Sequence, residues 1–140
     1  MTEVTQADLA LLAFARQAQE RAYAPYSGFR VGAAVYAGGE IYQGCNVENA
    51  SYGATSCAER LAAGAAVLAG NTELQAIAVV GDSTSPTVPC GMCRQFLAEF
   101  NPEMRVIMGG RCDEVAVAGL DELLPDAFVR GYLDQDDGAE

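Results

Sequence analysis

The sequence predicts an α/β protein, a three-layer α/β/α sandwich built around one mixed five-stranded sheet. Segments with helical and strand-like patterns alternate along the chain in the order α-β-β-α-β-α-β-β. The strand-like segments are short apolar runs that end close to glycine or a polar turn residue, which is typical of strands in a core. The chain has 140 residues with 51% hydrophobic content, which suffices for one core.

The first half of the chain predicts a helix, a hairpin and a second helix. Thr5 followed by Asp8 is a helix-capping pattern, and alanine and leucine then recur at helical spacing until Pro25. Glycines in the segment 37–40 fit the turn of a hairpin. The expected elements are a helix from Thr5 to about Arg21, strands at 29–36 and 41–47, a polar loop at 48–56 and a helix at 57–69.

The second half predicts three more strands and one helix. Leu74 to Val80 is a continuous apolar run bounded by Gly81, which is typical of a buried strand. The second and third helices both follow strands and should cover the sheet together, with the first helix on the other face. The expected elements are a strand at 74–80, a helix at 90–100 stopped by Pro102, and strands at 105–108 and 114–118.

No linker or internal repeat divides the chain, so we expect one domain at residues 1–130 followed by an acidic tail at 131–140. No apolar run approaches the roughly 20 residues that cross a bilayer. The N-terminus also lacks a signal-like segment, so we expect a cytoplasmic protein without a membrane partner. The net charge of −11 opposes binding of a nucleic acid polymer, and a small-molecule substrate fits better.

The absence of two residue types excludes most common catalytic devices. The chain contains no histidine, and all 8 of its basic residues are arginine. A Ser-His or Cys-His nucleophile, a lysine Schiff base, a phosphate-loop lysine and a histidine-ligated metal are therefore impossible for this chain alone. Any reaction must depend on carboxylates and cysteines.

The cysteine pattern indicates a metal site with one open position. Cys57 stands on one segment and Cys90 and Cys93 form a close pair on another, each at the expected start of a helix. Three protein ligands leave the fourth tetrahedral position of zinc free for water, and helix N-termini favour thiolates over thiols. The two other cysteines, Cys45 and Cys112, lie in apolar surroundings and are expected in the core.

Charged residues beside these cysteines have expected roles of their own. Three thiolates on a divalent cation leave one negative charge, and Arg60 and Arg94 are placed to compensate it by donating hydrogen bonds to sulfur. Glu59 follows Cys57 by two residues and could move protons between a metal-bound water and a substrate, as general base and then general acid.

The stretches that contain these residues resemble the small, homotetrameric cytidine deaminases of nucleoside salvage. The resemblance runs from about Tyr23 to Phe128, and a Pro-Cys-x-x-Cys element is general to zinc deaminases. The matching stretches are 23–27 (YAPYS), 29–34 (FRVGAA), 44–52 (GCNVENASY), 57–60 (CAER), 89–95 (PCGMCRQ) and 123–128 (LLPDAF).

The resemblance implies roles for individual residues. It makes Cys57, Cys90 and Cys93 the ligands of one zinc ion per chain and Glu59 the proton shuttle. It further implies that Asn46 and Glu48 bind the ribose, that Phe29 packs on the pyrimidine, and that Phe128 reaches the base from a neighbouring subunit. Tyr52 and Ala58 are assigned to substrate binding with them. The implied protein is a homo-oligomer, a tetramer by analogy, with shared active sites.

The expected activity is hydrolysis of cytidine and 2′-deoxycytidine to the corresponding uridines with release of ammonia, in pyrimidine salvage. One alternative is a deaminase of another aminopyrimidine nucleoside, such as blasticidin S, although Asn46, Glu48 and residues 123–128 favour cytidine. A second is a structural zinc module in which Cys45 or Cys112 supplies a fourth sulfur. A third is a redox Cys-x-x-Cys protein, which would need neither Cys57 nor Glu59.

Overall fold

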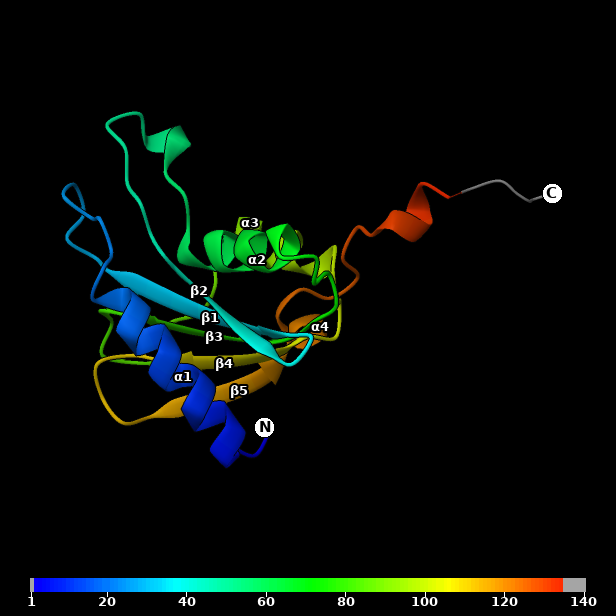
Figure 1. The fold of residues 1–140 in the computed structure, drawn as a ribbon, viewed down its shortest axis with the longest axis horizontal. Helices are drawn as coiled ribbons and strands as arrows, with labels where there is room; N and C mark the ends of the chain where they lie inside the picture. The colour runs from blue at the N-terminus through cyan, green and yellow to red at the C-terminus, as the bar shows by residue number, and fades with distance from the viewer. Residues whose placement is uncertain (1, 135–140) are drawn as a thin grey trace.

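Five strands form one mixed sheet between helices in the computed structural model, which describes residues 2–134 (Figure 1). The order of the main elements is the predicted one. They are α1 (Gln6–Gln19), β1 (Val31–Ala37), β2 (Glu40–Cys45), α2 (Ala58–Leu68), β3 (Leu74–Gly81), α3 (Gly91–Ala98), β4 (Arg105–Gly109) and β5 (Val115–Gly119). Three short helical segments were not predicted: η1 (Tyr52–Ala54), α4 (Leu120–Leu123) and η2 (Arg130–Tyr132).

The strands lie in the order β2-β1-β3-β4-β5. The β3 and β4 strands are parallel, with Ala78 opposite Ile107, and the other neighbouring pairs are antiparallel. The α1 helix covers one face of the sheet, and α2 and α3 cover the other (Figure 1). The predicted three-layer arrangement and mixed five-stranded sheet are therefore confirmed.

The two faces of the sheet carry two separate apolar clusters, because successive side chains of a strand point to opposite sides. In β1, Ala33 and Val35 face α2, whereas Ala34 between them faces α1. The larger cluster joins the alanine-rich face of α2 to Leu97 of α3 and to the sheet. The small side chains of α2 let this helix lie close to the strands.

Two glycines set the distance between helices and sheet. A Cβ atom on Gly44 would lie 2.5 Å from both the Ala58 carbonyl oxygen and the Ala62 nitrogen of α2. On the opposite face, a Cβ on Gly32 would lie 2.0 Å from the Ala15 carbonyl oxygen of α1. Only glycine permits these approaches of backbone to backbone, and Gly44 thereby fixes the N-terminal turn of α2 against β2.

A capping box begins α1, as the sequence predicted. The Asp8 nitrogen donates to the Thr5 hydroxyl at 3.2 Å, and the Thr5 nitrogen donates to the Asp8 carboxylate at 2.8 Å. Arg105 at the start of β4 also donates to both Asp8 oxygens, at 2.8 and 2.7 Å. This bidentate pair joins the helix start to the sheet and holds the pKa of Asp8 below its usual value.

Beyond β5 the chain leaves the sandwich as an extended arm (Figure 1). The arm follows α4 and contains η2, and Gln95 of α3 donates to the Phe128 carbonyl oxygen at 2.7 Å. The predicted acidic tail lies mainly outside the described residues, since its positions 135–140 are not among them. No helix between residues 2 and 134 is long and apolar enough to cross a membrane.

Candidate zinc and substrate site

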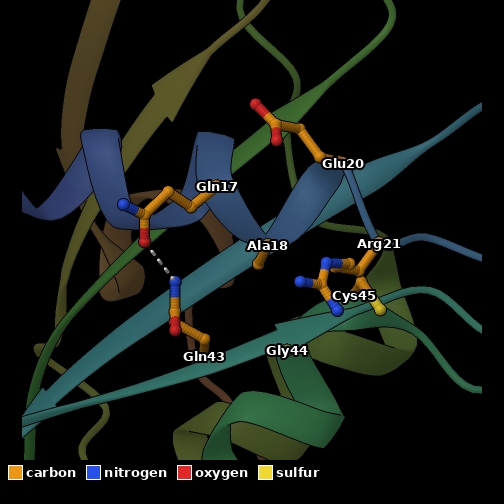
Figure 2. A pocket seen from close by; sticks show the side chains of 7 residues that line it. All are labelled: Gln17, Ala18, Glu20, Arg21, Gln43, Gly44 and Cys45. Carbon is orange, nitrogen blue, oxygen red and sulfur yellow. Dashed lines mark hydrogen bonds between the residues drawn. The ribbon is translucent and has the colours of Figure 1, made fainter.

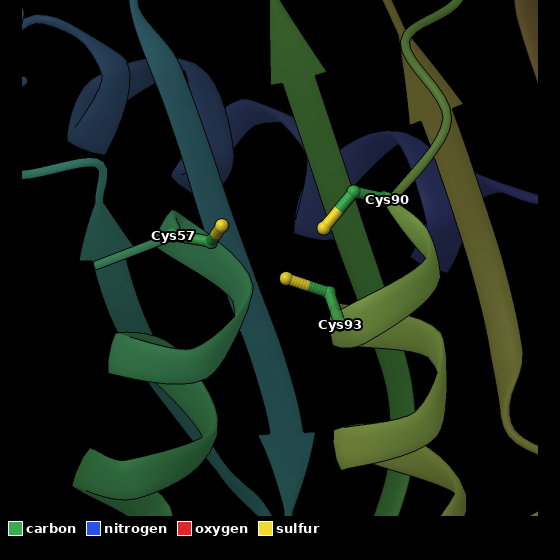
Figure 3. A group of neighbouring side chains, drawn as sticks. All are labelled: Cys57, Cys90 and Cys93. Atoms are coloured by element: carbon green, nitrogen blue, oxygen red, sulfur yellow. The ribbon is translucent and has the colours of Figure 1, made fainter. Parts of the chain in front are cut away.

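Three cysteine sulfurs meet where the N-termini of α2 and α3 lie side by side (Figure 3). Cys57 is the N-cap of α2, Cys90 is the N-cap of α3, and Cys93 lies in the first turn of α3. Their sulfur atoms all lie within 4.8 Å of one another. This geometry confirms the prediction that two adjacent helix starts bring the three cysteines together.

The spacing and chemistry of this donor set fit a zinc ion. Zn–S bonds of about 2.3 Å in a tetrahedral site put sulfurs roughly 3.8 Å apart, so small side-chain rotations would close the cluster on zinc. Among the described residues, no other group of cysteines, aspartates or glutamates comes together in this way. The site therefore offers three sulfur ligands and leaves room for a fourth ligand from outside the protein.

The two remaining cysteines are not ligands in this arrangement. Cys112 is exposed, and its thiol donates to the Thr84 carbonyl oxygen at 2.7 Å, so the expectation that it lies in the core is wrong. Its loop between β4 and β5 lies against the loop after β3, where the Arg111 nitrogen also donates to the Ser83 carbonyl oxygen at 2.8 Å. Cys45 is partly buried at the end of β2 and also lies outside the sulfur cluster.

The sulfur cluster favours an anionic thiolate even before metal binds. A hydrogen bond from Cys93 and the nearby Arg60 lower the pKa of Cys57 to about 5, against an opposing effect of burial. The same hydrogen bond, together with burial and the neighbouring negative charges, raises the pKa of Cys93. The Cys57 thiolate is thus stabilised by the hydrogen bond from Cys93 and by Arg60.

The two arginines beside the cysteines make different contacts. Arg60 Nη2 lies 3.7 Å from Cys57 Sγ and 3.2 Å from the Thr55 carbonyl oxygen, as compensation of thiolate charge requires. Arg94 donates to the carbonyl oxygens of Pro89 and Leu123, at 2.8 and 2.7 Å. Within residues 2–134 the described hydrogen bonds of Arg94 go to these carbonyls, and none goes to sulfur. Arg94 anchors the residue before Cys90 instead.

Glu59 is buried in the first turn of α2, with 5% of its surface exposed. Burial, aided by the negative charge of Cys57, raises its pKa to about 7, whereas a hydrogen bond from its own backbone opposes the rise. A carboxyl group with this pKa can both accept and release a proton near neutral pH. Glu59 therefore has the burial and the proton affinity expected of a general base and acid.

A cavity of about 220 Å³ opens beside the cysteines and Glu59. Three predicted substrate contacts line it, namely Phe29, Asn46 and Ala58. The sequence analysis did not single out the other residues of the wall, which are Val31, Thr55, Thr87 and Val88. These side chains carry no titratable group and share no motif spacing with the cysteines, so only the fold reveals them.

Asn46 is 8% exposed at the end of β2 and is already hydrogen-bonded to the backbone. Its amide nitrogen donates to the Phe29 carbonyl oxygen and its oxygen accepts from the Val31 nitrogen, both at 2.9 Å. An amide has two donor hydrogens and two acceptor lone pairs, so one of each stays available to a ligand. Asn46 both shapes the cavity wall and keeps groups that could contact a hydroxyl.

Glu48 and Tyr52 line a neighbouring cavity of about 360 Å³, which shares Thr55 with the first. Tyr52 is 76% exposed and packs edge-on against Tyr26, with ring centroids 6.2 Å apart. Glu48 accepts hydrogen bonds from the Ser27 hydroxyl and from two backbone nitrogens, which hold its pKa below the usual value. The predicted sugar and base contacts thus lie in two adjoining cavities.

Among the predicted substrate-binding residues, Phe128 is the one that lines neither of these two cavities. It is 57% exposed on the C-terminal arm, where its ring stacks on Tyr132 with centroids 5.3 Å apart. The backbone of Phe128 stays joined to α3, since its carbonyl oxygen accepts from Gln95.

A larger cavity, of about 430 Å³, lies between the end of α1 and β2 (Figure 2). Gln17 and Gln43 are joined across it by a hydrogen bond of 3.2 Å, and Arg21 lies near Cys45 at its other end (Figure 2). It holds none of the clustered sulfurs and no buried carboxylate. The chemistry therefore concentrates in the smaller cavity.

Comparisons with known proteins agree with this site. Residues 5–109 match the family described as the cytidine and deoxycytidylate deaminase zinc-binding region. A cytidine deaminase of Sporosarcina psychrophila is 47% identical over 125 residues, which cover 88% of this chain and 92% of that protein. The crystal structure of cytidine deaminase from Burkholderia pseudomallei superposes with a TM-score of 0.83 at 47% identity, covering 89% of this chain and 100% of that one. The Mycobacterium tuberculosis enzyme superposes with a TM-score of 0.75 at 40% identity, covering 89% and 98%.

Proposed function

The chain belongs to the cytidine and deoxycytidylate deaminase zinc-binding family, and from that premise we propose that it is a zinc-dependent cytidine deaminase. It hydrolyses cytidine and 2′-deoxycytidine to uridine and 2′-deoxyuridine and releases ammonia, in pyrimidine salvage in the cytoplasm. One observation carries the proposal: two of the three clustered cysteines, Cys57 and Cys90, line one cavity together with the buried Glu59, and this cavity is large enough for a pyrimidine ring. A structural zinc module would need neither the carboxyl group nor the cavity.

Cys57, Cys90 and Cys93 would hold the zinc ion, which when bound supplies an acidified water to the reaction. Glu59 takes a proton from the attacking water as the new bond to C4 forms, and delivers it to N3 of the ring. A second proton then passes from the new hydroxyl group to the amine as the C4–N bond breaks. Ammonia leaves, and the pyrimidine is left with a carbonyl at C4.

The substrate-binding residues divide between base and sugar. Phe29 packs on the pyrimidine ring, and Ala58 borders the cavity beside the cysteines. Asn46 and Glu48 bind the ribose hydroxyls, and Tyr52 closes the sugar side. Hydrogen bonds from this amide and carboxylate to the sugar hydroxyls favour a nucleoside over the free base, because the free base has no hydroxyl groups to make them.

We further propose a homo-oligomer, a tetramer by analogy, whose active sites are completed by Phe128 of a neighbouring chain. The exposure of Phe128 on a projecting arm supports this arrangement. Exposed apolar side chains elsewhere also favour burial between copies. They are Leu61, Val67 and Leu68 on α2 and Leu133 on the arm.

The function is tested by following the absorbance change of cytidine and measuring zinc in the same sample. Glu59→Ala should keep one zinc ion per chain and the fold but lose nearly all turnover, because the shuttle is gone while the ligands remain. Activity of this variant near the wild-type level would remove Glu59 from its role. Blasticidin S as a parallel substrate separates the alternative, which predicts faster hydrolysis of blasticidin S than of cytidine.

A further inference from the structure

The hydroxyl group of Ser27 lies between two proposed substrate contacts. It donates to Glu48 Oε2 and accepts from the Phe29 nitrogen, the latter at 2.9 Å. Glu48 Oε1 accepts in turn from the nitrogens of Tyr26 and Ser27, at 2.9 and 3.1 Å. One small side chain therefore connects the carboxylate of the sugar side with the backbone of the aromatic residue of the base side.

The C-terminal side of Phe29 is held by contacts from other parts of the chain. Asn46 binds the Phe29 carbonyl oxygen, and Asp82 at the end of β3 accepts from the Arg30 nitrogen at 2.8 Å. These contacts do not involve Ser27. Loss of the Ser27 hydroxyl should therefore release only the N-terminal side of Phe29 and one oxygen of Glu48, leaving the fold in place.

We propose that Ser27 is a positioning residue for nucleoside recognition, whose hydroxyl group sets the sugar-binding Glu48 and the base-binding Phe29 in one arrangement. The inference rests on the proposed function, because it takes these two residues as the sugar and base contacts. Ser27 itself acts through them. Its side chain lies in the cavity of Glu48, and the Phe29 ring lies in the adjoining cavity beside the cysteines.

A double-mutant cycle with cytidine as substrate tests this inference. Ser27→Ala should lower kcat/KM about tenfold in the otherwise wild-type chain, since a hydrogen bond to a carboxylate and one to a backbone nitrogen are lost. In a Glu48→Ala background the same change should cost less than about threefold, because only the Phe29 contact remains to lose. Ser27→Thr keeps a hydroxyl group and should recover most of the activity.

Ser85→Ala is the matched control. Ser85 is exposed, and the hydrogen bond that it accepts from Ser83 goes to its backbone carbonyl oxygen, which alanine keeps. It should leave kcat/KM, zinc content and Tm unchanged. Equal losses from Ser27→Ala in both backgrounds, or failure of Ser27→Thr to recover activity, would overturn the inference while the proposed function stands. A wild-type chain that holds zinc but does not deaminate cytidine would overturn both.

Discussion

Replacing Gly44 by alanine should displace the first turn of α2 and so distort the zinc site. The added Cβ would lie 2.5 Å from backbone atoms of Ala58 and Ala62, where ordinary contact begins at 3.4 Å. The N-terminal turn of α2 must therefore move by about 0.9 Å, and that turn carries Cys57 and Glu59. Overpacking of this kind costs about 1–3 kcal/mol of unfolding free energy, and a displacement near 1 Å can lower kcat/KM roughly 100-fold.

The measurements are urea unfolding of the zinc-loaded protein, competition for zinc with a coloured chelator, and kcat/KM with cytidine. Gly64→Ala is the matched control, because Gly64 lies within α2 and its Cβ would meet nothing within 4 Å. Alanine there should stabilise the helix by about 0.4–1 kcal/mol. The reasoning is refuted if Gly44→Ala is as stable and as active as Gly64→Ala with equal zinc affinity.

Three other results are expected. Asp8→Asn should lose about 2 kcal/mol of stability at neutral pH, since a charge-assisted pair with Arg105 is broken. Because the folded pKa of Asp8 is lowered, the stabilisation by this pair is present above pH 3.8. The urea unfolding midpoints of the two proteins should therefore converge as the pH falls through the folded pKa. Cys45→Ala and Cys112→Ala should each keep one zinc per chain by metal analysis, and loss of metal in either would indicate a closed four-sulfur site. Mixed oligomers of Glu59→Ala and Phe128→Ala subunits should recover activity that neither has alone, and no recovery would argue against shared sites.

The three main helices and the five strands could be predicted from the sequence because each carries a local signal of its own. Thr5 and Asp8 mark the start of α1, and the apolar run from Leu74 marks a buried strand, as the structure has them. The cysteine cluster was predictable for a related reason. Cys57 and Cys90 begin helices that follow β2 and β3 and cover the same face of one sheet, so the topology allows their approach.

Other features depend on contacts that no local pattern contains. Arg60 and Arg94 both lie close to cysteines in the sequence, yet Arg60 contacts the Cys57 sulfur, whereas Arg94 donates to the carbonyl of Leu123, which is distant in sequence. Thr87 and Val88 line the cavity because the loop after β3 folds back over it, and nothing in their residue types indicates this. The exposed position of Cys112, bonded to Thr84 of a different loop, is likewise absent from the local pattern.

The use of cysteines as N-caps has a consequence for the integrity of the protein. A serine or aspartate cap would satisfy the first amide groups of its helix, but neither Cys57 nor Cys90 makes such a bond. A metal ion bound by both sulfurs would link the first turns of the two helices, so removal of the metal should destabilise both turns at once. Amide exchange in the opening turns of α2 and α3 would then report metal occupancy as directly as catalysis does.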